Sequence, residues 1–200
     1  MNYTARDDHV PEAGRNNRVI AERIRATYHK LPYKTMPKIM WRYLAMVVTQ
    51  QLNYFPVKGG ISDYYSPHMI LQKKTLDYNK HCQVEFGEYV QACNEPNPTN
   101  SQAPRTIDAI YLRPMNNLQG GHELMDLNSG RLITRRKVTP IPVTPSVIEL
   151  VNTMGKSQKM PILKFTNRHG IPLLPADWIA GVEYTHENDK SEEDEECDEA

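Results

Sequence analysis

The sequence predicts an α+β fold in which helices come first and a small antiparallel β module follows. Apolar residues recur at helical spacing between residues 11 and 72, whereas short β-prone runs alternate with turn-forming clusters between residues 81 and 143. The chain has 200 residues, of which 39% are hydrophobic. This length and composition allow one or two small domains with a modest core.

The first predicted helix runs from Pro11 to His29, after a frayed N-terminus over residues 1–8. Proline suits the first turn of a helix, and Glu12 beside it favours the positive end of the helix dipole. One face of this helix is apolar at four-residue spacing. That face consists of Ile20, Ile24 and Tyr28.

Two further helices are expected before the β module. Thr35 is the predicted cap of the second helix, which Pro37 begins and the pair Gly59-Gly60 ends. Its buried face is predicted to consist of Ile39, Tyr43, Leu44, Val47, Val48 and Leu52. Ser66 followed by Pro67 predicts the start of a short third helix that ends near Gln72. Three helices in a row form a poor independent domain, so we expect residues 9–76 to be the closing part of something larger.

The β module, residues 81–143, contains four runs that favour strands. These are Val84–Ala92, Thr106–Leu112, His122–Leu127 and Arg131–Val138. The intervening segments, Asn94–Pro104 and Asn116–Gly121, are rich in turn formers, and Asn128-Ser129-Gly130 is a hairpin signal. The pattern predicts a small antiparallel barrel or a rolled sheet, with that turn at a hairpin tip and no helix between Ile107 and Val138.

After the β module we expect a linker over residues 144–184. Pro140, Pro142 and Pro145 favour an extended chain. Within this stretch Pro145–Thr153 is a predicted helix, Met160–Phe165 a predicted short strand and Pro175–Tyr184 an isolated apolar peptide. Residues 185–200 are predicted to be an acidic disordered tail.

A net charge of zero conceals a strong asymmetry. Residues 183–200 carry ten acidic residues and one lysine, net −9, so the other 182 residues carry 23 Lys and Arg against 14 Asp and Glu, net +9. A basic body with an acidic tail suits contact with nucleic acid. A solvated surface with a solubilising tail explains the same charges equally well.

The sequence lacks the motifs that are typical of several other classes of protein. No apolar run approaches the roughly 20 residues of a membrane helix, and no secretory leader is visible. The three cysteines form no C-x-x-C motif, which favours a reduced, intracellular compartment and excludes a zinc finger. No phosphate-binding loop or serine-hydrolase elbow is present. The cysteines are Cys82, Cys93 and Cys197.

Two sets of side chains have both a functional and a plain interpretation. His81, Cys82 and Cys93 could be forced into a metal site, but neighbouring strand residues point to opposite faces, so a surface histidine and a buried cysteine are favoured. Tyr64, Tyr65 and Tyr78 are expected in the core or in an interface rather than stacked on bases.

The β module resembles the SH3-like module that follows the integrase core in copia-type retrotransposon polyproteins. The resemblance begins with Phe86-Gly87 and Tyr89-Val90 and continues in the strand Ile110-Tyr111-Leu112. It ends in the hairpin from Gly121 to Gly130, which leads to Ile133, Arg135 or Arg136, and Val138. The order and spacing of the three blocks carry the resemblance.

The first helix resembles the C-terminal helix of the integrase core of the same family. Arg15, Asn17 and Arg18 match the Arg, Asn and Arg of its motif, but Gly14 stands where the motif has a glutamate. In that family this glutamate completes an Asp-Asp-Glu triad that holds two divalent ions, Mg²⁺ or Mn²⁺. The resemblance places the two aspartates upstream of Met1, so we expect no catalytic residue and no metal site in this chain.

Two other glutamates were weighed as substitute ligands. Glu12 lies two residues from Gly14, which rotates it about 200° around the helix axis. Glu22 is a better partner for Arg18 or Arg25 than for a metal.

The predicted nucleic-acid contacts are basic and form two groups. On the first helix they are Arg15, Arg18 and Arg25, and in the β module they are Arg113, Arg131, Arg135, Arg136 and Lys137. Such groups neutralise phosphates without reading sequence. The plain alternative is surface charge that protects a strand edge from pairing.

The predicted fold is therefore the C-terminal helices of an incomplete RNase H-like integrase core, then a small antiparallel SH3-like β-barrel, then the acidic tail. The resemblance implies DNA binding in retroelement integration, with no strand transfer by this chain alone. It implies DNA, other integrase segments or the reverse transcriptase as partners, no membrane, and the nucleus or a cytoplasmic particle as location. The alternative is a non-catalytic adaptor that binds a protein through the β module and the acidic tail.

Overall fold

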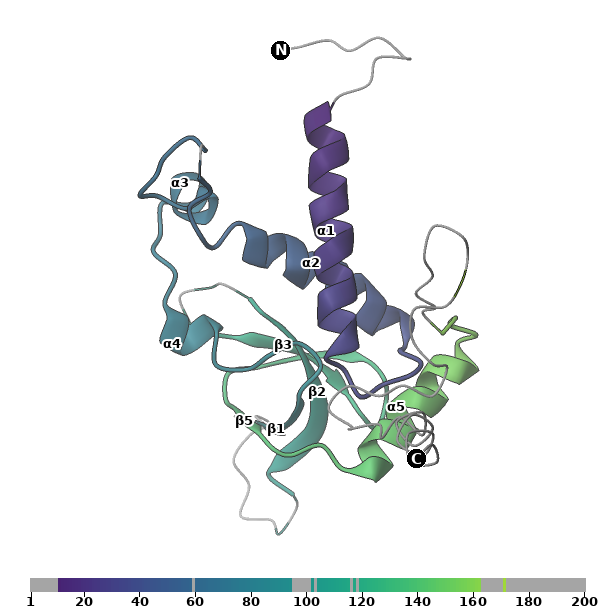
Figure 1. Ribbon diagram of the computed structural model, residues 1–200. Helices are drawn as coiled ribbons and strands as arrows, with labels where there is room; N and C mark the ends of the chain where they lie inside the picture. The colour runs from purple at the N-terminus through teal and green to yellow at the C-terminus, as the bar shows by residue number, and fades with distance from the viewer. Residues whose placement is uncertain are drawn as a thin grey trace, which may run out of the picture.

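The computed structural model describes residues 11–58, 60–94, 102, 104–115, 117, 119–162 and 171, except the side chains of residues 11, 12 and 80. The predictions for the N-terminus, the acidic tail and the peptide Pro175–Tyr184 lie outside these residues, as does most of the predicted Asn94–Pro104 loop. The fold is α+β, with helices against an antiparallel sheet (Figure 1).

The helices before the sheet largely follow the predicted pattern. They are α1 (Pro11–His29), α2 (Lys38–Leu52), α3 (Pro67–Gln72) and the single turn α4 (Tyr78–His81), which the sequence analysis missed. In α3 the Ser66 hydroxyl accepts a hydrogen bond from the Met69 N–H at 3.3 Å, as a cap should. The predicted Thr35 cap of α2 is wrong, because Pro37 occupies the cap position and makes no side-chain cap hydrogen bond.

The strands are shorter than the predicted runs. They are β1 (Tyr89–Cys93), β2 (Thr106–Pro114), β3 (His122–Asp126), β4 (Leu132–Arg135) and β5 (Val138–Pro140). The first predicted run becomes a strand only at Tyr89, since Gly87 has a positive φ of 87° that a strand does not tolerate. The fourth run divides at a bend on Arg136.

The hairpin turn between β3 and β4 is confirmed, and the described residues between Ile107 and Val138 contain no helix. Asp126 organises the turn, because its carboxylate accepts hydrogen bonds from the backbone N–H groups of Asn128 at 3.2 Å and Ser129 at 3.1 Å. Gly130 closes the turn with a φ of 65° and donates to the Asp126 carbonyl at 2.8 Å. This glycine needs the left-handed conformation that side chains disfavour.

The strand order is β4-β3-β2-β1-β5, with antiparallel pairing throughout. The described pairings do not join β4 to β5, so the sheet is open in its hydrogen bonding and a closed barrel stays a prediction. The outer strands would lie roughly 19 Å apart in a flat sheet. Only Arg136 and Lys137 connect them, and three Cα–Cα steps span at most about 11 Å. The sheet is therefore strongly curled.

Curling gives the sheet an enclosed inner face and an outer face that helices cover. The inner core consists of Val84, Val90, Ala92, Ala109, Tyr111 and Leu124, with Ile133 and Val138 at its margin. On the outer face, Ile110, Leu112 and Met125 pack with apolar side chains of α1 and α2. Alternate residues of β2 thus serve different cores, which explains why four consecutive positions, 109–112, are all buried.

The outer core also receives α5 (Pro145–Ser157), which runs four residues beyond its predicted end and buries Val147 and Val151. This part of the predicted linker is therefore a packed element, and the outer core crosses the predicted boundary between residues 76 and 81. Residues 160–162 of the predicted strand at Met160–Phe165 have no strand pairing, and the rest lies outside the described residues.

The start of α2 is held by α5, about 120 residues away in the chain. The Asn152 carboxamide oxygen accepts hydrogen bonds from the backbone N–H groups of Lys34 and Thr35, each at 2.9 Å. The Gln158 oxygen accepts from the Lys38 N–H at 2.8 Å. Gln158 thus satisfies a donor in the first turn of α2, and Asn152 satisfies two donors of the segment before the helix.

Candidate nucleic-acid interface

The basic residues of α1 lie on an exposed helix that projects from the body (Figure 1). Arg15, Arg18 and Arg25 are all exposed, and only the C-terminal half of the helix packs on α2 through its apolar stripe. Arg18 Nε donates to Glu22 at 2.9 Å, as the four-residue spacing predicted. Two further cations that the sequence analysis did not select, Arg23 and Lys30, line a cleft beside this helix.

A second basic group follows the edge strand β4. Arg131 precedes the strand, Arg135 ends it, and Arg136 and Lys137 form the connection to β5. Arg131, Arg136 and Lys137 are exposed. The stretch from Arg131 to Lys137 contains no acidic residue. Because β4 spans four residues at about 3.3 Å each, this edge presents cations at two places roughly 13 Å apart.

Two of these guanidinium groups have contacts that limit their reach. Arg135 is half-buried and donates to the Thr134 carbonyl at 2.8 Å. Arg136 donates to the Gln119 carboxamide oxygen at 3.3 Å, which ties the β4–β5 connection to the β2–β3 loop. The acceptors in these two contacts are a backbone carbonyl and a carboxamide oxygen, which carry no charge.

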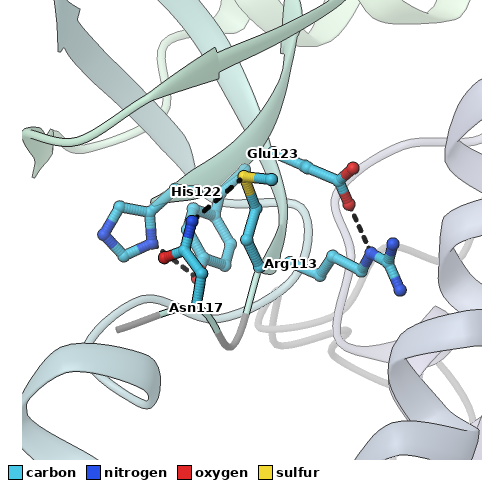
Figure 2. Close-up of polar contacts among 6 residues, drawn as sticks. Arg113, Asn117, His122 and Glu123 are labelled. Carbon is cyan, nitrogen blue, oxygen red and sulfur yellow. Dashed lines mark hydrogen bonds and ion pairs between the residues drawn. The ribbon is translucent and has the colours of Figure 1, made fainter. Parts of the chain in front are cut away.

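Arg113 differs from the other predicted contact residues. A register shift between Tyr111 and Arg113 directs this side chain toward α2, where its guanidinium lies 5.3 Å from the centre of the Tyr43 ring. Its Nε also donates to Glu123 on the paired strand (Figure 2). The side chain is only 25% exposed, and the carboxylate compensates its charge. Arg113 therefore joins sheet and helix rather than presenting a free cation.

A polar cluster that the sequence analysis missed lies on the other side of the same hairpin. Figure 2 shows His122 pointing away from Glu123, as neighbouring strand residues do. Its Nδ1 atom lies 3.2 Å from the hydroxyl of Tyr111. Burial, and then the nearby charge of His81, lowers the pKa of both His122 and His68. The signal in the sequence is three histidines on separate elements, which only the fold brings together.

The tyrosines and Cys82, which had both a functional and a structural interpretation, are exposed. Tyr64, Tyr65 and Tyr78 are 87%, 58% and 50% exposed, so they do not lie in the core, and their expected place in an interface stays a prediction. Cys82 is exposed rather than buried, and it follows α4 instead of lying in a strand.

The residues present do not fit the divalent ions that the resemblance implies. Gly14 lies within α1 and offers no oxygen side chain, and Glu22 is paired with Arg18. Within the described part of the chain, no three His, Cys, Asp or Glu side chains are grouped to hold a metal ion. Hard divalent ions need several oxygen ligands, so we derive no metal-dependent step for this chain.

A cleft with a volume of about 790 Å³ lies between the α1–α2 pair and the strand-like segment Pro140–Val143. Its walls combine apolar side chains such as Phe55 with charges of both signs, including Arg23 and Glu88. Burial raises the pKa of Tyr33, whose hydroxyl donates to the Gly87 carbonyl at 2.9 Å in the cleft wall. None of the described helices is long and apolar enough to cross a membrane.

The chain matches no family model, no curated protein and no solved structure. The resemblance to copia-type integrases thus depends on the residues and motifs given above.

Proposed function

We propose that this chain is the C-terminal part of a retroelement integrase that binds DNA without sequence preference and performs no strand transfer alone. In this proposal α1 and α2 are closing helices of an RNase H-like core, and the curled sheet is an SH3-like module. The observation that carries it is the exposed β4 edge, where Arg131, Arg136 and Lys137 stand with no acid among them. Phosphate contact needs such cations and no base-reading group.

The net charge of the described body agrees with this role. Residues 11–162 carry 20 Lys and Arg against 11 Asp and Glu. Part of that charge is used internally, because ion pairs join Arg18 to Glu22, Lys30 to Glu85 and Arg113 to Glu123. Each of these pairs uses one cation and one acid, so the excess of cations is the same with or without them, and Arg131 and Lys137 of the β4 edge contribute to it.

The salt dependence of DNA binding tests the proposal. Fluorescence anisotropy with a labelled duplex should show affinity falling steeply with salt, and each lost phosphate contact should reduce the logarithmic slope by about 0.9. Arg136→Ala with Lys137→Ala should reduce the slope, whereas Lys156→Ala in the last turn of α5 with Lys159→Ala just after it should not. Removing residues 183–200 should strengthen binding, since the acidic tail competes for the same cations. An affinity for the duplex that changes neither with salt concentration nor with this truncation would refute the proposal.

A second experiment addresses catalysis. The chain should show no strand transfer or end processing with Mg²⁺ or Mn²⁺, and Gly14→Glu alone should restore none, because one carboxylate does not hold two metal ions. Metal-dependent cleavage by the unmodified chain, lost in Glu12→Gln, would show that the wrong carboxylate was considered.

The cleft beside α1 favours a second candidate function, an adaptor that binds a protein segment. Its mixed apolar and charged lining suits a peptide better than a phosphate backbone. Binding to a partner would then depend weakly on salt and would be lost on deleting residues 175–184. This deletion, together with the salt series, separates the two functions.

A further inference from the structure

The segment from Phe55 to Tyr78 exposes an unusual number of large apolar side chains. Eight are exposed within these 24 residues, and Ile61, Tyr64 and Leu71 are at least 80% exposed. The other five are Phe55, Val57, Tyr65, Ile70 and Tyr78. Figure 1 shows α3 standing away from the sheet, beside the end of α2. Apolar surface concentrated in this way marks an interaction site more often than chance exposure.

Within this segment α3 forms one wall of a small open hollow of about 320 Å³. Its lining is an aromatic ring, aliphatic and thioether groups and two ammonium groups, from Tyr65, Met69, Ile70, Lys73, Lys74 and Thr75. Lys73 ends α3 in the left-handed conformation, with φ 53°, and its N–H donates to the Met69 carbonyl at 2.9 Å. The helix end thereby brings two consecutive lysines into the lining of the same hollow as Tyr65.

The chemistry of the hollow selects one kind of occupant. Lysine is depleted in the centres of protein–protein interfaces, so two lysines beside an exposed tyrosine fit a protein partner poorly. An unpaired nucleotide offers both a flat ring to stack on Tyr65 and a phosphate to pair with Lys73 or Lys74. A base inside an intact duplex offers no free face to the ring.

We propose that this hollow, lined by Tyr65, Lys73 and Lys74, binds an unpaired nucleotide of single-stranded DNA or of a frayed DNA end. The inference rests on the proposed DNA-binding function and adds a preference for unpaired bases to it. The β4 edge holds phosphates of either form, whereas the hollow distinguishes single strand from duplex.

The test compares the binding of the full chain to an oligothymidine of roughly 20 nucleotides and to a blunt duplex of the same length. Tyr65→Leu keeps an apolar side chain but removes the ring, so it should weaken single-strand binding about tenfold and leave duplex binding unchanged. Tyr65→Phe should retain single-strand affinity. Leu150→Ala, at an exposed apolar position on α5, is the control for a general surface change.

The chain supplies a matched control for the lysine as well. Lys73 and Lys159 both have a positive φ, at 53° and 55°, and each follows the end of a helix. Glycine at either position removes the charge and keeps the backbone unstrained. Lys73→Gly should weaken single-strand binding more than duplex binding, whereas Lys159→Gly should change neither preferentially.

Each outcome has a distinct meaning. Equal losses of single-strand and duplex binding, or equal effects of Tyr65→Leu and Leu150→Ala, would overturn the hollow as a nucleotide site and leave the proposed function standing. No binding of the unmodified chain to either DNA would overturn both. Failure of Tyr65→Leu to affect DNA, with loss of a protein partner instead, would assign the hollow to that partner.

Discussion

The inner and outer cores both consist of apolar side chains, but the residues of the outer core come from a wider range of the sequence. The inner core is local, because its members lie between Val84 and Val138. The outer core joins α1 and α2 to the sheet and to α5, so its contacts span from Ile20 to Met154. The curled sheet carries most of its own packing, whereas the helices depend on segments at both ends of the described chain.

This difference predicts which element holds the molecule together. α5 closes the outer core from the far end of the chain, and it satisfies the backbone donors at the start of α2. Without α5, the outer core would lose the buried Val147 and Val151. The helices and the sheet should then separate before the sheet itself unfolds.

The largest expected effect comes from truncating a leucine in each core. Leu44→Ala in the outer core and Leu124→Ala in the inner core should each cost about 2–5 kcal/mol, since both side chains are fully buried. Urea unfolding followed by tyrosine fluorescence and by circular dichroism would measure both. If the cores form one cooperative unit, each variant unfolds in a single transition; a sheet that survives in Leu44→Ala would show that the outer core is separable.

The next effect concerns the contact of α5 with the segment before α2. A Cβ on Gly155 would lie 2.8 Å from the backbone carbonyl carbon and oxygen of Thr35, which cannot move aside as a flexible side chain can. Gly155→Ala should therefore cost about 1–3 kcal/mol despite the better helix propensity of alanine.

Gly14→Ala is the matched control for this variant, because Gly14 is an exposed glycine within α1. There alanine should stabilise by up to about 1 kcal/mol. If Gly155→Ala and Gly14→Ala shift the thermal unfolding temperature in the same direction, the close approach of α5 to the Thr35 backbone would be contradicted.

A smaller effect is expected from the side chain that holds the turn before α2. Asn152→Ala removes the acceptor of two backbone N–H groups and should cost about 1–3 kcal/mol. Asn152→Asp keeps an acceptor oxygen and should retain most of the stability. Hydrogen exchange at Lys34 and Thr35 would locate the change, and unaltered exchange in Asn152→Ala would count against this role.

The sequence predicted the elements whose signals are local. The stripe of α1, the Ser66 cap of α3 and the turn at Asn128-Ser129-Gly130 all depend on residues within a few positions of each other, and the structure has each of them. Thr35 shows where local reasoning fails. It is a good cap by type, yet the donors near it are satisfied by Asn152 and Gln158.

The candidate site was predictable in composition but not in arrangement. The run from Arg131 to Lys137 was visible as a basic stretch, but no local signal divided it between β4 and its connection to β5. Arg113 looked equivalent to these residues, and only the register shift in β2 turns it toward Tyr43 and Glu123. Tyr65 was expected in the core or in an interface, and its exposure of 58% excludes the core.

The smallest expected effect is a pH dependence at the border between the two cores, where α3 and α4 meet the β2–β3 hairpin. His122 contacts the inner-core Tyr111, and His68 lies 5.7 Å from Tyr54 between ring centres. Burial first, and the charge of His81 second, lowers the pKa of both from its ordinary value of 6.5.

The folded state binds a proton at His68 and at His122 less readily than the unfolded state does. The contribution of these neutral histidines to the free energy of unfolding is therefore fully present above pH 6.5 and declines as the pH falls below it. The chain should therefore unfold at lower urea concentration near pH 5.5 than near pH 7.5. The double variant His68→Asn with His122→Asn should reduce this difference between the two urea concentrations. His29→Asn, on α1, should reduce it less, because partial burial first and the charge of Arg25 second lower the pKa of that one histidine alone. If the double variant keeps the full pH dependence, the dependence arises from other titratable groups and not from these two histidines at the border between the cores.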